Sequence, residues 1–310
     1  MLSDVLQARI REYAPANAIE QENMLAELMQ HYVLASLSRS GLFSAAMFHG
    51  GTCLRICHSM NRFSEDLDFL LKQPDRKFAW EPHLQRIAAD CAAEGLRIEI
   101  QDKSRAVGAV RKAFVKTDSI GSVVTLDLPF ERAISKKIRI RLEIDINPPH
   151  GSSFETSYLS FPTTAPLTTQ TLSSGFATKT HAMLCRRYVK GRDWYDFLWY
   201  VARRNVPDLA LLGNALLQQG PWQGRRFEVS NEWLLQALRE KIESVDWQRA
   251  ADDVRRFLPL SEQRGLGSWT MDLFLHQVER MAAYLAEQHC NDAGLPTTTT
   301  WSALSAQRAR

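Results

Sequence analysis

The feature that most constrains this chain is a short segment in which acidic and apolar residues alternate, Asp66-Leu67-Asp68-Phe69. Alternate side chains of a β-strand point to opposite faces. A strand here therefore buries Leu67 and Phe69 and places Asp66 and Asp68 together on the other face. Two such carboxylates repel one another unless a cation lies between them, and Mg²⁺ prefers carboxylate and phosphate oxygens. We expect a sheet that carries a metal site.

A glycine-rich turn, Gly50-Gly51-Thr52, precedes this strand and opens a predicted short helix at 53–60. Glycines at the start of a helix let a phosphate approach the backbone, whose free N–H groups donate to it. Thr52 adds a hydroxyl donor. The turn and the paired carboxylates together predict a site for a nucleoside triphosphate (NTP) bound with Mg²⁺.

A second acidic strand is predicted at 139–147, where Glu143 and Asp145 share one face and alternate with aliphatic residues. One of them completes a site of three carboxylates. When such a site holds two metal ions during catalysis, one lowers the pKa of the attacking hydroxyl and the other neutralises the leaving pyrophosphate. The spacing leaves open which of Glu143 and Asp145 is the third ligand. The competing interpretation is that these acidic residues only mark exposed sheet edges.

The patterns around these motifs predict an α+β fold. Apolar residues recur at helical spacing over 17–40, with Asn17 as the cap and Gly41 just past the end. Period-two runs then predict a mixed or antiparallel sheet of about five strands. These strands are 63–71, 97–101, 110–116, 123–128 and 138–146.

The second half of the chain is predicted to be helical. Pro148, Pro149 and a Ser/Thr-rich stretch separate it from the sheet. With 310 residues the chain can form two lobes. We expect an α/β domain at 1–165, a helical domain at 166–290 and a flexible tail at 291–310. The predicted helices are 173–188, 193–203, 208–219, 231–242, 247–257 and 269–289.

Charge and cysteine content narrow the function classes. The net charge of +3 is too small to indicate nucleic-acid binding by itself. The five cysteines form no CxxC pair or secreted disulfide framework, the amino-terminal residues do not form a signal peptide, and no apolar run is long enough to cross a membrane. We therefore expect a cytoplasmic protein with no membrane partner.

Basic residues are concentrated in a few segments. Such clusters attract phosphates, but on helices they are also typical of ordinary solvated surface. They therefore leave an RNA ligand open. The clusters are Arg132, Lys136, Lys137, Arg139 and Arg141, and then Arg186, Arg187, Lys190, Arg192, Arg203, Arg204, Arg225 and Arg226.

The chain resembles the AbiEii/AbiGii family of nucleotidyltransferase toxins, within the DNA polymerase β-type nucleotidyltransferase superfamily. The likeness is carried by FHGGT with RFSEDLD, by LEIDINPP, by KTHAMLCR and by KGRDWYDF, which together span 48–201. The resemblance implies a nucleotidyltransferase-like mixed sheet flanked by helices and an all-helical C-terminal lobe. It also implies transfer of a nucleoside monophosphate from an NTP to an acceptor.

The resemblance carries the family's site residues onto this sequence. Many members have Gly-Ser in the phosphate turn, so the hydroxyl contact moves here to Thr52. An ammonium at Lys179 stabilises negative charge on the leaving group, and Asp193 or Asp196 orients it. The competing interpretation is that Lys179 is a solvated helix residue and that the two aspartates only cap the helix or pair with Arg192. The metal ligands are then Asp66, Asp68 and Asp145, with Glu143 as the alternate; the nucleotide contacts are Gly50, Gly51, Thr52, Arg62, Ser64 and Lys179; Lys179 and Asp193 are also catalytic, with Asp196 in support.

The resemblance further implies the toxin of a toxin–antitoxin or phage-exclusion pair. Its acceptor would be RNA, in particular the 3′ end of a tRNA, and its partner a separately encoded antitoxin. Two other functions fit the residues. One is transfer to a small hydroxylated molecule, as in antibiotic nucleotidyltransferases, and the other is a module that binds Mg-NTP without turnover. Three carboxylates argue against a pure binding module, because a binder needs fewer.

Overall fold

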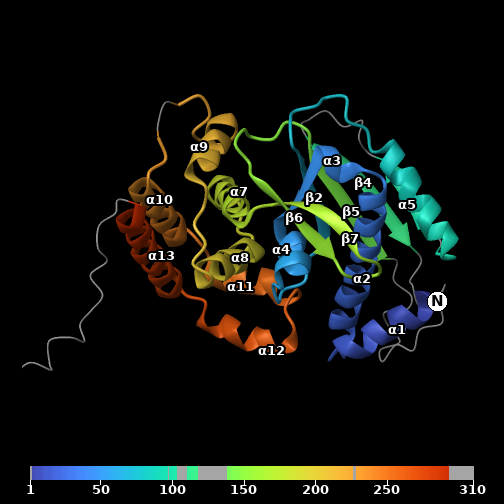
Figure 1. Cartoon of the computed structure of the whole chain (residues 1–310). Helices are drawn as coiled ribbons and strands as arrows, with labels where there is room; N and C mark the ends of the chain where they lie inside the picture. The colour runs from blue at the N-terminus through green and yellow to red at the C-terminus, as the bar shows by residue number, and fades with distance from the viewer. Residues whose placement is uncertain (1, 97, 103–109, 118–137, 226–227, 293–310) are drawn as a thin grey trace, which may run out of the picture.

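The computed structural model describes residues 2–96, 98–102, 110–117, 138–225 and 228–292. Its centre is a seven-stranded sheet in the order β3-β4-β5-β2-β1-β7-β6 (Figure 1). β2 pairs in parallel with β5 and β1 with β7, while the other neighbours are antiparallel. The predicted mixed sheet flanked by helices is therefore confirmed. The strands are β1 (Ala46–His49), β2 (Asp66–Leu71), β3 (Ile98–Asp102), β4 (Val110–Thr117), β5 (Ile138–Asp145), β6 (Phe154–Leu159) and β7 (Ala165–Gln170).

The sheet has more strands than the sequence pattern predicted. β1, β6 and β7 were missed. β1 has only four residues and runs directly into the glycine turn, and β6 is largely exposed on both faces, so it lacks the alternation that marks a half-buried strand. The strand predicted at 123–128 lies outside the described residues. The stretch expected to be irregular after Pro149 instead forms the β6–β7 hairpin.

The long helix α2 (Ala18–Arg39) was predicted and is confirmed. The side chain of Asn17 accepts a hydrogen bond from the Glu20 backbone N–H at 2.9 Å, which satisfies one of the free donors at the helix start. Gly41, just past the helix end, has φ +78°, a left-handed conformation that glycine adopts without strain. α2 and α5 (Glu81–Ala93) pack together and α2 crosses the sheet at β5 and β7. The helices α1 (Leu2–Tyr13), α3 (Leu42–Ala45) and α5 were not predicted.

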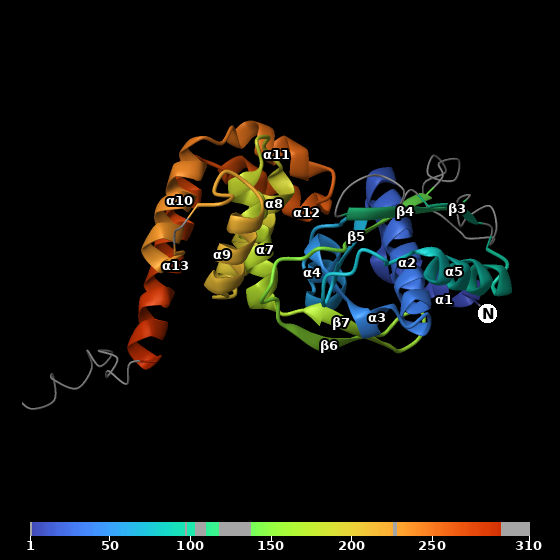
Figure 2. The ribbon, with the colours of Figure 1, turned by 90° about the horizontal axis from the view of Figure 1, so that it is seen from above.

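A helical lobe lies beside the sheet, as Figure 2 shows from above. All six predicted helices form, with ends that differ by a few residues, and α12 (Leu260–Gln263) and the 3₁₀ helix η2 (Arg264–Ser268) are additional. None of the described helices is both long and apolar enough to cross a membrane. The predicted helices are α7 (Leu172–Cys185), α8 (Gly191–Ala202), α9 (Leu209–Gln218), α10 (Asn231–Glu243), α11 (Trp247–Arg255) and α13 (Met271–Asp292).

Two hydrophobic cores underlie this arrangement. One lies between the sheet and α2, and the other joins the helices of the C-terminal lobe. α4 (Gly50–His58) contributes to both, because Cys53 is part of the first core and Leu54 of the second. The predicted domain boundary at 165/166 coincides with the start of β7. We therefore propose that the boundary lies at Thr171, which caps α7.

Candidate active site

The predicted pair of carboxylates lies on one face of β2. Leu67 and Phe69 are buried in the sheet's core, while Asp66 and Asp68 are only partly covered. β2 is a central strand, so its neighbours β1 and β5 bring further side chains to the same face. His49 of β1 is in register with Asp68.

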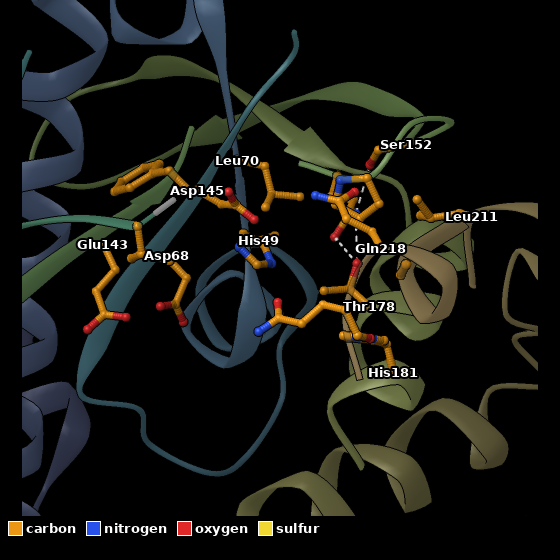
Figure 3. Close-up of a pocket in the computed structure, with 16 residues that line it drawn as sticks. His49, Asp68, Leu70, Glu143, Asp145, Ser152, Thr178, His181, Leu211 and Gln218 are labelled. Carbon is orange, nitrogen blue, oxygen red and sulfur yellow. Dashed lines mark hydrogen bonds between the residues drawn. The ribbon is translucent and has the colours of Figure 1, made fainter. Parts of the chain in front are cut away.

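The register of β5 against β2 distinguishes the two candidates for a third carboxylate. Glu143 lies directly opposite Asp68, whereas Asp145 lies opposite Leu70. Figure 3 shows the side chains of Asp68 and Glu143 extending side by side, with Asp145 beyond them near Leu70. This geometry moves our preference from Asp145 to Glu143, a difference that spacing along one strand cannot reveal.

Electrostatic coupling supports the same grouping. Burial raises the pKa of Asp68, and the nearby Glu143 carboxylate raises it further. Burial and then repulsion by Asp68 raise the pKa of Asp66 to about 6. Burial also raises the pKa of Asp145, but no carboxylate contributes to that shift.

Two basic side chains partly offset this negative charge. The Arg141 guanidinium lies between Asp66, at 3.6 Å, and Glu143, at 3.5 Å. Lys112 Nζ is 2.9 Å from Glu143 Oε1. Both cations come from strands and are about half exposed, so they are able to swing away towards solvent.

The glycine turn fits closely against these acids. α4 begins at Gly50, three residues earlier than predicted. Gly50 has φ +79°, and a Cβ on it would lie 2.7 Å from Asp68 Oδ2. A Cβ on Gly51 would clash with the guanidinium of Arg62. Both glycines are therefore required for the helix start to approach its neighbours.

Thr52 does not fit the predicted role of a phosphate donor. Its side chain is fully buried and its hydroxyl donates to the backbone carbonyl of Asp66. We therefore assign Thr52 to holding α4 against β2. Ser64 is partly exposed beside the turn, and Gln30 Nε2 donates to its backbone carbonyl at 2.8 Å. Its hydroxyl remains suitably placed for a nucleotide.

Lys179 and the two aspartates of α8 form a buried ionic network. Lys179 Nζ is 2.8 Å from Asp193 Oδ1 and 2.8 Å from Asp196 Oδ2. Arg62 donates to both oxygens of Asp196, at 2.6 and 2.7 Å, and Arg186 pairs with Asp193. The prediction that an aspartate orients Lys179 therefore fits the geometry, and the aspartates do not pair with Arg192.

Arg62 differs from its predicted role. Its side chain is 3% exposed, and besides Asp196 it donates to the Phe63 carbonyl at 3.0 Å. Its guanidinium is thus committed to protein groups, and we assign it to fixing the network. Burial alone would raise the pKa of Asp196, but the paired Arg62 and Lys179 hold it below its usual range.

Two cavities meet at this site. The first, which we call the cationic cavity, has a volume of about 180 Å³ and lies between the glycine turn, β2, α7 and the start of α8. The carboxylates of Asp66 and Asp68 and the side chains of five basic residues line it. The main lining residues are Gly50, Gly51, Ser64, Asp66, Asp68, Lys179, Asp193 and the basic Arg62, Arg186, Lys190 and Arg192.

The second cavity, shown in Figure 3 and called here the glutamine cavity, has a volume of about 230 Å³. His49, Asp68 and Thr178 line both cavities and so mark their junction. Burial, and then the charge of Lys179, lower the pKa of His49 to about 4, so its imidazole is neutral at neutral pH. Its other lining residues include Glu143, Asp145, Gln170, Leu211, Gln218 and Gln219.

Sequence reasoning missed three residues of the cationic cavity. Arg186, Lys190 and Arg192 were noted only as a basic cluster. Their spacing around Asp193 was a usable signal, because a solvated helix face has no reason to concentrate cations beside a buried acid. His49, which immediately precedes the glycine turn, was also missed. The basic residues at 132, 136, 137 and 226 lie outside the described residues.

The residues fit a divalent cation at the carboxylate pair. Within the described residues, no three or more acidic, histidine or cysteine side chains already converge as a ligand cluster. Asp66 and Asp68 are nevertheless two hard oxygen ligands, and their pKa values are raised first by burial and then by a neighbouring carboxylate, Asp68 for Asp66 and Glu143 for Asp68. A bound Mg²⁺ relieves that repulsion, and Glu143 is the nearest further ligand once its basic partners are displaced.

Comparison with known proteins gives a match to one family model. The family described as "Nucleotidyl transferase AbiEii toxin, Type IV TA system" matches residues 32–277. No curated protein matches the sequence. Two solved structures from Helicobacter pylori resemble the fold. A candidate nucleotidyltransferase has 14% identity and a TM-score of 0.48, covering 84% of this chain and 95% of its own. JHP933 has 15% identity and a TM-score of 0.47, and the match covers 85% of this chain and 97% of JHP933.

Proposed function

The chain belongs to the AbiEii family of nucleotidyltransferase toxins, and from this premise we propose that it transfers a nucleoside monophosphate from Mg-NTP to a hydroxyl of RNA, in particular the 3′ end of a tRNA. The observation that carries the proposal is the junction of the two cavities. Asp68 lies at this junction, and together with Asp66 it faces a cavity that five basic side chains also line. Carboxylates suit a metal ion and cations suit a triphosphate, so one site accommodates both.

The cationic cavity is suited to the triphosphate. The N–H groups at the start of α4 and the hydroxyl of Ser64 supply neutral donors. Lys179, held between Asp193 and Asp196, supplies a fixed positive charge that stabilises the developing negative charge of the leaving group. Mg²⁺ held by Asp66, Asp68 and Glu143 would lower the pKa of the attacking hydroxyl and neutralise phosphate charge.

The glutamine cavity is suited to the acceptor. In-line displacement requires the attacking oxygen and the leaving pyrophosphate to lie on opposite sides of the α-phosphorus. With the phosphates in the cationic cavity, the attacking hydroxyl enters from the side of Glu143. Neutral His49 lies at the junction and offers a hydrogen bond without adding charge. Apolar Leu211 and the amides of Gln218 and Gln219 suit a nucleoside there.

Label transfer tests this proposal directly. Purified protein is incubated with each α-³²P-labelled NTP, Mg²⁺ and total cellular RNA. The wild type should label RNA and the Asp66→Ala/Asp68→Ala variant should not. Asp272→Ala, which removes an exposed carboxylate at the start of α13, is the matched control and should label RNA normally. Label on RNA with the double variant as well would refute the assigned site.

A second acceptor class is favoured by one observation. The glutamine cavity is only about 230 Å³, a volume that suits a small hydroxylated molecule as well as one terminal nucleoside. Transfer of label to a small molecule, with none to RNA, would support that alternative. Bound NTP without pyrophosphate release to any acceptor would instead support a non-catalytic module.

The biological setting we propose is that of a cytoplasmic toxin that acts in phage defence and is neutralised by a separately encoded antitoxin. The type IV toxin–antitoxin family supports this setting. Expression alone should arrest growth, and co-expression of the neighbouring gene product should relieve the arrest. Growth arrest by the Asp66→Ala/Asp68→Ala variant would separate toxicity from nucleotidyl transfer and contradict the proposal.

A further inference from the structure

The basic residues of the cationic cavity are not equivalent. Four of its five basic side chains are fixed to carboxylates. Lys179 is held by two aspartates at 2.8 Å, and Arg62 is bound to Asp196 through two hydrogen bonds. Arg186 pairs with Asp193, and Arg192 pairs with Glu65 at 3.1 Å. These four charges are therefore largely balanced inside the protein.

Lys190 is the exception. It makes no ion pair with any carboxylate in the described part of the chain, although it lines the same cavity. The groups that face it are mostly cations: Arg186 and Lys179 of α7, Arg192 of α8 and, across the outer wall, Lys241 of α10. The carboxylate whose charge acts on Lys190 is Asp68 of β2, while Asp193, which lines the same cavity, is paired with Lys179. An unpaired ammonium among cations indicates that an anion from outside completes this site.

The neighbouring cations lower the proton affinity of Lys190. Burial and then the charges of Arg186, Arg192 and Lys179 lower the pKa of Lys190 to about 8. The side chain is therefore mostly protonated at neutral pH, and it releases its proton more readily than a surface lysine does. A group with such a pKa suits proton transfer near neutral pH.

The backbone at Lys190 is held in place. Lys190 caps the start of α8, and the next residue, Gly191, packs so closely on the Ala250 carbonyl that a Cβ would clash. The Gly191 N–H donates to Asp253 at 2.8 Å. α11 thus holds the backbone next to Lys190 in place, while the long side chain of Lys190 remains able to move with a ligand.

Lys190 also stands between two cavities. A third, outer cavity of about 230 Å³ shares Arg186, Lys190 and Asp193 with the cationic cavity. Arg187 and Lys241 add two further basic side chains to its lining, beside apolar residues such as Val189 and Trp194. Lys241 Nζ donates to the Arg186 carbonyl at 2.8 Å. A multiply charged anion leaving the cationic cavity therefore meets Lys190 first and a basic cavity beyond it.

We propose that Lys190 binds the pyrophosphate as it leaves, donates a proton to it and passes it into the outer cavity. This inference rests on the proposed nucleotidyl transfer. In that step the bond between the α-phosphorus and the oxygen bridging to the β-phosphorus breaks, and its electron pair stays on that oxygen. The oxygen takes a proton from the Lys190 ammonium, while the acceptor hydroxyl gives its own proton to solvent water as its oxygen bonds to the α-phosphorus. Neutral Lys190 then regains a proton from solvent through the outer cavity.

Two substitutions separate proton donation from simple charge. Lys190→Arg keeps the positive charge but scarcely releases a proton. Lys190→Met removes both, and Lys77→Met, at an exposed loop lysine, is the matched control. The readout is the single-turnover rate of label transfer from about pH 6.5 to about 9.5, beside affinity for a non-reacting α,β-methylene NTP. A merely structural role would change the affinity together with the rate.

We expect the wild-type rate to fall at the alkaline end of this range, where Lys190 loses its proton. Its pKa of about 8 belongs to the ligand-free protein, and the bound triphosphate raises it. Lys190→Arg should transfer on the order of 100-fold more slowly at neutral pH, without that fall, yet bind the analogue within about 3-fold of wild type. An NTP with a β,γ-difluoromethylene bridge, whose leaving group needs protonation less, should recover most of the lost rate. A Lys190→Arg enzyme with the wild-type rate would overturn proton donation.

Binding of inorganic pyrophosphate, measured by isothermal titration, keeps this inference separate from the proposed function. Lys190→Met should weaken pyrophosphate binding roughly 10-fold relative to wild type and Lys77→Met, the loss typical of one charge-assisted contact. Normal binding by Lys190→Met would overturn the site itself, even if RNA is labelled. Absence of label transfer by the wild type would instead refute the proposed function, whatever the pyrophosphate result.

Discussion

Two pairs of aspartates, one on β2 and one on α8, contribute to the same site but have opposite electrostatic environments. On α8, Asp193 and Asp196 are surrounded by Lys179, Arg62 and Arg186. Arg62 and Lys179 keep the pKa of Asp196 low despite its burial. On β2, Asp66 and Asp68 face one another, and their pKa values are raised. The first set is complete within the chain, and the second is not.

The difference shows how carboxylates that hold other groups in position can be distinguished from carboxylates that take part in the reaction. A buried acid whose charge is balanced by resident cations holds other groups in position. A partly buried acid that remains unbalanced costs stability unless something from outside the chain balances it. Catalytic metal sites are of this second kind, so charge balance tells the two sets of aspartates apart although the residue type is the same.

The largest expected effect is on chemistry at the unbalanced set. The Asp66→Ala/Asp68→Ala variant should lose at least about 10³-fold in label transfer, because metal stabilisation of the transition state is worth several kcal/mol. Its fold should survive, as judged by circular dichroism. Residual transfer within about 10-fold of wild type would break the comparison, since these acids would then not be the reacting ones.

The balanced set should govern stability instead. Arg62→Met leaves Asp196 buried without its main partner and should lower the free energy of unfolding by about 3–5 kcal/mol. Urea denaturation measures this. Arg255→Met, which breaks an exposed pair with Asp252, should leave the denaturation midpoint nearly unchanged. Equal midpoints for both variants would show that the buried network contributes no more than a surface pair.

The third carboxylate sharpens the comparison within one strand. Glu143→Gln should lower label transfer by about 10²-fold, because Glu143 lies opposite Asp68 and its charge couples to both β2 acids. Asp145→Asn, two residues along the same face, should cost less than about 10-fold. The reverse order would return the role to Asp145, the residue that the family resemblance suggests.

The smallest expected effect is a gain in stability. The folded state raises the pKa of Asp66 from an ordinary value near 3.8 to about 6, so at neutral pH ionised Asp66 disfavours folding. Asp66→Asn should therefore stabilise the metal-free protein by roughly 1–3 kcal/mol at pH 7. The gain should shrink as pH falls through the window from about 6 to about 4 and vanish below it. Added Mg²⁺ should raise the melting temperature of the wild type and not of Asp66→Asn, and an unchanged wild type would contradict the metal site.

Much of the fold was predictable because its signals are local. The alternation at 66–69 placed the carboxylates on one face of β2, and the caps at Asn17 and Gly41 fixed both ends of α2. The elements that were missed either are very short, as β1 is, or lie at an exposed sheet edge, as β6 does. Such strands depend on pairing with neighbours rather than on their own pattern.

The site was predictable in composition but not in the role of each residue. Thr52 and Arg62 have the right chemistry for a nucleotide, yet their donors are already hydrogen-bonded within the protein. Thr52 donates to the backbone carbonyl of Asp66, and Arg62 donates to the carboxylate of Asp196. The choice between Glu143 and Asp145 depends on strand register. Among the described residues, Lys190 has no carboxylate partner because the acidic side chains near it pair with the four other basic side chains of the cavity. Each of these facts is a property of three-dimensional neighbours, to which spacing along the chain gives no access.

The ion pair between Arg62 and Asp196 also bears on when the protein becomes active during its own synthesis. These residues are separated by 134 positions, so a ribosome that has just made the glycine turn and the first carboxylates has yet to make the helix that completes the site. At roughly 5–20 residues per second, that interval is on the order of ten seconds. A nascent chain cannot assemble the complete site during this time, so nucleotidyl transfer has to wait until α8 has left the ribosome.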